Sequence, residues 1–110
     1  MAVRDPETVD TIVRSAEGVV VLGMTEDRQY TPETTPSLVE DLKVKLNTYI
    51  YAVKSGQIPE RRPGEPGLVL LYAASQPPEE VLEVLRFAGH VLADDSVTVD
   101  WRTLEATARG

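Results

Sequence analysis

The sequence predicts a two-layer α+β or α/β sandwich with the element order ββαβαβ, in which a mixed four-stranded sheet carries two helices on one face. Two short, continuous apolar runs, residues 19–24 and 68–73, are typical of strands buried on both faces. Each run is followed by a stretch with apolar residues at three- and four-residue spacing, which indicates an amphipathic helix. The length of 110 residues fits one compact domain, 1–110, with residues 1–7 and 105–110 as frayed ends.

The first two strands are predicted to form a hairpin. Residues 8–14 mix β-branched and polar side chains, and the following SAEG has the composition of a turn before VVVLGM. Since residues 19–24 are apolar on both faces, we expect something to cover each side of the second strand. Residues 25–35 contain charges, a proline and no apolar period, so they are predicted to form a surface loop.

The first helix has start and stop signals. Thr35 before Pro36 predicts a cap and a first-turn proline, and Ser37 with Glu40 is a possible capping box. Gly56 marks the end, because glycine accepts the left-handed turn that closes many helices. The predicted apolar stripe consists of Leu38, Leu42, Leu46, Tyr49, Ile50 and Val53.

The second half of the chain is predicted to be a loop, a strand, a helix and a last strand. Residues 57–67 are rich in Pro and Gly, which indicates an exposed loop. Residues 75–78 open the second helix, with Glu79 and Glu80 in its positive first turn. Gly89 lowers the helix propensity, which suggests a close approach to another backbone. Val97, Val99 and Trp101 alternate with polar residues as a strand does.

The composition excludes several classes of partner and cofactor. The formal net charge of −7 repels phosphate backbones and anionic lipids, so nucleic acid and membrane surfaces are poor partners. The absence of cysteine excludes disulfides and Cys-ligated metals, and fits a reducing compartment. No signal sequence or membrane span is visible, so we expect a cytoplasmic protein. Neither GxGxxG nor a P-loop occurs, and no cofactor or metal is expected.

Several charged residues are candidates for a functional site. His90 is the only histidine and has no nucleophile nearby in sequence, so a structural or exposed role is favoured over catalysis. Three carboxylates, those of Asp94, Asp95 and Asp100, could gather around a divalent cation, but their spacing matches no loop motif and a solvated helix end is favoured. Two adjacent arginines, residues 61 and 62, indicate a solvated loop more than a ligand clamp.

The hairpin VDTIV…VVVLGMTED and the helix LKVKLNTYIYAVKSGQI resemble a family of small bacterial proteins catalogued only as a domain of unknown function. The family's central helix is similar in its Lys, Asn and Tyr and in the Ser-Gly pair that follows. In this chain those positions are Lys45, Asn47, Tyr49, Ser55 and Gly56.

The loop after the hairpin also resembles the family's loop. The family tends to have an acidic, a basic and then an aromatic residue there, and the counterparts are Asp27, Arg28 and Tyr30. The family more often has His and Trp in this loop, which is a departure. The resemblance implies the fold and no activity.

The apolar excess of the central strands points to association. With both helices on one face, the second face of the sheet would remain bare, and a large exposed apolar patch usually marks a partner site. We expect a homodimer or another protein partner. The alternative is that the loop 25–35 and the C-terminal tail cover this face. The predicted interaction residues are Val20, Leu22, Met24, Val69, Leu71, Asp27, Arg28 and Tyr30.

The sequence therefore predicts a non-catalytic cytosolic domain that acts by protein association. Two alternatives stay open. One is an enzyme with a diffuse site around His90 and the carboxylates, which would require a concave pocket with converging groups. The other is an acidic inhibitor or immunity-type protein for a basic partner, suggested by small size and negative charge.

Overall fold

The computed structural model describes residues 11–58, 61–62 and 64–104. Their element order is ββαβαβ, which confirms the prediction, with one short 3-10 helix added before the last strand. The elements are β1 (Thr11–Arg14), β2 (Val20–Glu26), α1 (Thr35–Lys54), β3 (Gly67–Ala73), α2 (Glu79–Leu92), η1 (Ala93–Asp95) and β4 (Val97–Thr103).

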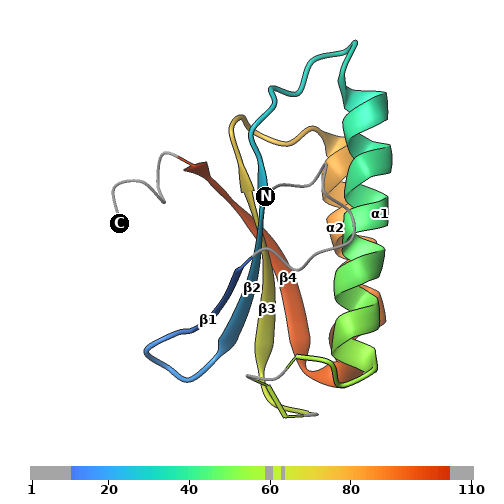
Figure 1. The fold of residues 1–110 in the computed structure, drawn as a ribbon. Coiled ribbons are helices and arrows are strands. Elements are labelled where there is room, and N and C mark those ends of the chain that lie inside the picture. The colour runs from blue at the N-terminus through green and yellow to red at the C-terminus, as the bar shows by residue number, and fades with distance from the viewer. Residues whose placement is uncertain (1–10, 59–60, 63, 105–110) are drawn as a thin grey trace.

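The four strands form one mixed sheet in the order β1-β2-β3-β4. The hairpin strands β1 and β2 are antiparallel, whereas β2, β3 and β4 are parallel to one another. Both helices lie on the same side of the sheet, as predicted (Figure 1). Because each helix returns the chain from the end of one parallel strand to the start of the next, α1 and α2 run in the same direction.

The core lies between the sheet and the two helices. Alternate side chains of β2 and β3 point into it, since successive residues of a strand face opposite sides. Tyr49 from α1 is completely buried, and its hydroxyl donates a 2.5 Å hydrogen bond to the carbonyl oxygen of Gly23 on β2. The other helix residues in the core are Leu42, Leu46, Ala52, Val53, Val81, Leu85, Ala88 and Leu92.

The start of α1 differs from the prediction by one residue. Thr34 is the N-cap residue, and its side chain makes no capping bond to the helix. Its hydroxyl is occupied in the loop, where it accepts a 2.9 Å hydrogen bond from the Thr31 N–H and donates one of 2.9 Å to the Gln29 carbonyl. At the other end, Gly56 has a φ of 72°, which confirms the predicted left-handed turn.

The last strand of the sheet carries a local hydrogen bond. β4 is bonded to β3 on one side only, within the part of the chain that is described. The backbone N–H of Trp101 on this strand donates to the Oδ1 atom of Asp100 at 2.8 Å. A carboxylate thus lies against the backbone of β4.

Gly89 does not approach another backbone, so that prediction was wrong. A Cβ atom at this position would meet only the side chain of Val99 on β4, at 3.8 and 3.9 Å. Those are ordinary van der Waals distances. The position therefore has room for a methyl group.

Replacing Gly89 with alanine is expected to stabilise the protein by about 0.5–1 kcal/mol, because alanine has the higher helix propensity and fits without a clash. Urea denaturation followed by circular dichroism would measure the gain. Gly23→Ala is the contrasting variant and should be destabilising, since its Cβ would clash with Thr11 Oγ1 and lie 3.2 Å from the Tyr72 ring. A loss of stability in Gly89→Ala would contradict the predicted room at position 89.

Candidate interaction surface

The five apolar residues predicted to contact a partner lie in the core instead. Their side chains are at most 1% exposed and point at the helices, so they are closed to a partner in this structure. The physical reason is strand periodicity: the apolar runs were recognised correctly, but the wrong alternate set was assigned to the outer face. The residues concerned are Val20, Leu22, Met24, Val69 and Leu71.

The opposite face of the sheet is less bare than expected. Leu70 is only 4% exposed, and Val21, Leu68 and Tyr72 are half-buried. The Tyr72 ring lies over Gly23 of the neighbouring strand, where a Cβ atom would be 3.2 Å from it. Part of the apolar surface of this face is therefore covered by its own large side chains.

The loop after β2 does not lie over the open face where its placement can be followed at Tyr30. From the loop after β2, Tyr30 packs against the core on the helical side of the sheet. The tail, residues 105–110, lies outside the described residues. The loop thus completes the core. On the open face of the sheet, the outer strand β4 contributes the exposed polar side chains of Thr98, Asp100 and Arg102.

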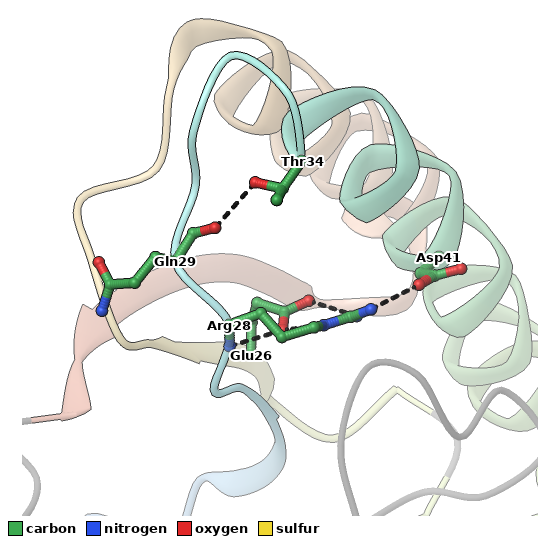
Figure 2. Close-up of polar contacts among 5 residues, drawn as sticks. All are labelled: Glu26, Arg28, Gln29, Thr34 and Asp41. Carbon is green, nitrogen blue, oxygen red and sulfur yellow. Dashed lines mark hydrogen bonds and ion pairs between the residues drawn. The ribbon is translucent and has the colours of Figure 1, made fainter.

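Arg28 is held in an ion-pair network at the end of β2 (Figure 2). Its Nε and Nη2 atoms each donate a 2.8 Å hydrogen bond to Glu26, whose side chain is 1% exposed. Its Nη1 atom donates to Asp41 of α1 at 3.0 Å. The hydrogen bond to Glu26 is the main reason that the Arg28 pKa is raised. Arg28 therefore joins the strand, the loop and α1, which is a structural role.

The two other loop candidates have different surroundings. Asp27 is exposed, whereas Tyr30 is half-buried and its backbone N–H donates to Ser75 Oγ at 3.1 Å. Burial, and then the nearby Glu26 carboxylate, raise the pKa of the Tyr30 phenol. Tyr30 borders a hollow of about 410 Å³ at the carboxyl end of the parallel strands, where α/β proteins commonly bind ligands. Its lining is Tyr30, Thr31, Pro32, Thr35, Pro36, Gln76, Pro78 and Glu80.

The three aspartates considered as a cation site do not come together. Asp95 accepts a 2.6 Å hydrogen bond from Lys54, Asp94 is exposed, and Asp100 bonds the backbone of its own strand. His90 is exposed on α2. Among the residues that the structure describes, no three His, Asp or Glu side chains come together as a metal site would require.

Arg61 is not the solvated residue that the sequence suggested. Its side chain is 5% exposed, and it donates to the carbonyl oxygens of Glu65, at 3.0 Å, and of Asp95. The neighbouring Arg62 is exposed, and its backbone N–H donates to the Glu65 carboxylate at 2.7 Å. Arg61 thus ties the Pro-rich loop to the turn before β4, because its guanidinium has enough donors to satisfy two carbonyls.

The positions shared with the resembled family combine core and surface residues. Lys45 is completely buried, and its Nζ atom lies 5.7 Å from the centroid of the Tyr49 ring. Asn47, two residues away on α1, is exposed. Ser55 follows the helix as its C-cap residue, and Gly56 has the left-handed conformation.

The most exposed apolar side chains of the helices lie on the outer surface of the helical layer. Tyr51 of α1 is 65% exposed, Phe87 of α2 is 68% exposed and Val44 is 50% exposed. A groove of about 560 Å³ runs between the two helices, and we call it the helix-layer groove. Its lining is Val39, Lys43, Leu46, Asn47, Ile50, Glu80, Glu83, Val84, Phe87 and Ala88.

A second hollow, of about 640 Å³, flanks the other side of α1. Val44 and Tyr51 line it together with Ile12 of β1, and Asn47 borders both hollows. The two hollows place apolar side chains on both sides of α1. Sequence reasoning missed this surface, although Val44 and Tyr51 lie outside the apolar stripe predicted for the first helix and could have indicated it.

A model of one protein family matches residues 1–105, and its description is "Family of unknown function (DUF6572)". The chain belongs to this family. The resemblance drawn from the hairpin and the central helix is thereby confirmed. No curated protein and no solved structure matches this DUF6572 chain. Within its described residues, neither helix has the length and apolar character needed to cross a membrane.

Proposed function

We propose that this DUF6572 domain is a non-catalytic, cytoplasmic protein-association domain, and that the helix-layer groove is its contact surface. One observation carries the proposal: Phe87, 68% exposed, stands at the edge of an apolar groove between two helices. Large exposed apolar patches mark interaction sites in soluble proteins. Water is a poor environment for such a ring, and a partner surface would remove it from water.

The composition of the groove fits association better than catalysis. Val39, Ile50, Val84 and Phe87 contribute apolar surface, and Lys43, Glu80 and Glu83 are the charged side chains of the lining. Aromatic anchors inside a polar rim are the usual arrangement of protein interfaces. The alternative of a His and carboxylate enzyme is less well supported, since His90 and the aspartates do not converge.

Site-specific photo-crosslinking would test the proposed surface. A photoreactive phenylalanine analogue at position 87, introduced in the cells that naturally make the protein, is expected to form adducts with a second polypeptide chain. Val13 is the matched control position, because it is 57% exposed on the opposite face of the sheet. Adducts should be frequent at position 87 and rare at position 13. Equal yields at both positions, or none at position 87, would contradict the proposal.

A further inference from the structure

The two walls of the helix-layer groove have opposite charges. Lys43 lines the wall formed by α1, and Glu80 and Glu83 line the wall formed by α2. The Lys43 ammonium contacts Glu40 at 3.1 Å, but both side chains are more than half exposed. Such an exposed ion pair is weak, so Glu40 would compete little with a new partner for Lys43. The groove therefore presents a positive side and a negative side along an apolar floor.

We propose that the occupant of the groove is a second copy of this chain, related to the first by a twofold axis that runs along the groove. This inference rests on the proposed function. A twofold axis in this direction places α1 of one protomer against α2 of its partner, with the helices still parallel. Each Lys43 then faces the partner's Glu80 and Glu83, and the same contacts occur twice.

The charges select this axis over the other twofold arrangement that would bring the grooves face to face. An axis across the groove stacks α1 on α1 and α2 on α2 with the paired helices antiparallel. The glutamates would then lie against the partner's α2 wall, which contributes no basic residue to the groove, and Lys43 against its α1 wall, which contributes no acidic one. Charged side chains left in an interface without a partner of opposite sign are unfavourable. Each chain already has a net charge of −7, which makes local charge matching a requirement for self-association.

The apolar residues fit the same arrangement. Phe87 and Val84 project from the α2 wall, and Val39 and Ile50 belong to the α1 wall. In the proposed dimer, Phe87 of each protomer packs against the α1 wall of the other. Two aromatic rings that are largely exposed in the single chain thus become the centre of one interface.

Charge reversal tests the dimer and its axis together. The full-length wild-type chain is expected to sediment as a dimer at high micromolar concentration. Lys43→Glu makes both walls acidic, and the double variant Glu80→Lys, Glu83→Lys makes both walls basic. Each of these variants alone should be monomeric, with a dissociation constant raised at least about 100-fold. Circular dichroism verifies that both variants remain folded.

Mixing the two variants provides the decisive measurement. In an equimolar mixture, each acidic wall meets a basic wall, so native mass spectrometry should detect a one-to-one heterodimer that neither variant forms with itself. Glu17→Lys, an exposed charge reversal in the turn of the hairpin, should leave the wild-type dimer unchanged. A dimer that tolerates both reversals, or a mixture without heterodimer, would overturn the proposed geometry.

Failure of the proposed dimer can be distinguished from failure of the proposed association surface. If the wild-type chain is monomeric and position 87 crosslinks to a different protein, the second copy is excluded and the association surface stands. If the chain is monomeric and position 87 gives no adduct, both proposals fail.

Discussion

Replacing Arg28 with alanine is expected to lower the free energy of unfolding by about 3–5 kcal/mol. The reason is the environment of Glu26, whose carboxylate is 1% exposed and accepts two side-chain hydrogen bonds from Arg28. Without Arg28, the buried carboxylate loses the cation that compensates its desolvation. Urea denaturation followed by circular dichroism would measure the loss.

Two further variants separate the buried contact from the exposed one. The side chain of Asp41, the outer partner of Arg28, is 40% exposed. Asp41→Asn removes the negative charge of this partner and should lower the free energy of unfolding by about 1 kcal/mol or less. Adding Glu26→Gln to Arg28→Ala removes the buried, uncompensated carboxylate charge and should restore part of the lost stability. If Asp41→Asn were as damaging as Arg28→Ala, the buried pair would not be the origin of the effect.

Replacing Leu22 with alanine is expected to cost about 2–5 kcal/mol of stability, because it leaves a cavity at a fully buried core position of β2. The measurement is the urea midpoint, together with an unchanged dependence of stability on urea. The adjacent residue Val21 is the control, since it faces the other side of the sheet and is half-buried. Val21→Ala should cost about 1 kcal/mol.

This pair of variants tests the side-chain assignment of the central strands. If Leu22 lay on an association surface, its truncation would change self-association and leave the unfolding midpoint nearly constant. A larger loss of stability in Val21→Ala than in Leu22→Ala would show that the outer face is the better packed one.

The sequence was sufficient to predict the architecture, because the elements have strong local signals. The 20-residue helix α1 has an apolar stripe and a closing glycine, and both apolar runs became parallel inner strands. The orientation of those strands was not predictable from the same signal. In a continuous apolar run, no alternation of polar and apolar residues identifies the outer face. The sequence of residues 20–24 therefore fits either orientation of the strand equally well.

The candidate surface was harder to predict than the fold. Phe87 belongs to no motif, and its exposure depends on how α2 rotates against α1 and the sheet. The role of Arg28 depended on a contact with Asp41, 13 residues away, and on the burial of Glu26. Buried ion pairs of this kind depend on tertiary packing, which composition and spacing do not encode.

The carboxylate of Asp100 also bears on the protein's resistance to aggregation. An outer strand with unsatisfied amides is a template on which other chains can add in β conformation, and natural sheets often protect such strands with charged side chains. At β4 the carboxylate occupies the amide of Trp101 and places a negative charge where an incoming strand would lie. Addition of a strand at the β4 edge is thereby disfavoured, and contacts between chains at this edge are left to side-chain surfaces, which can be selective.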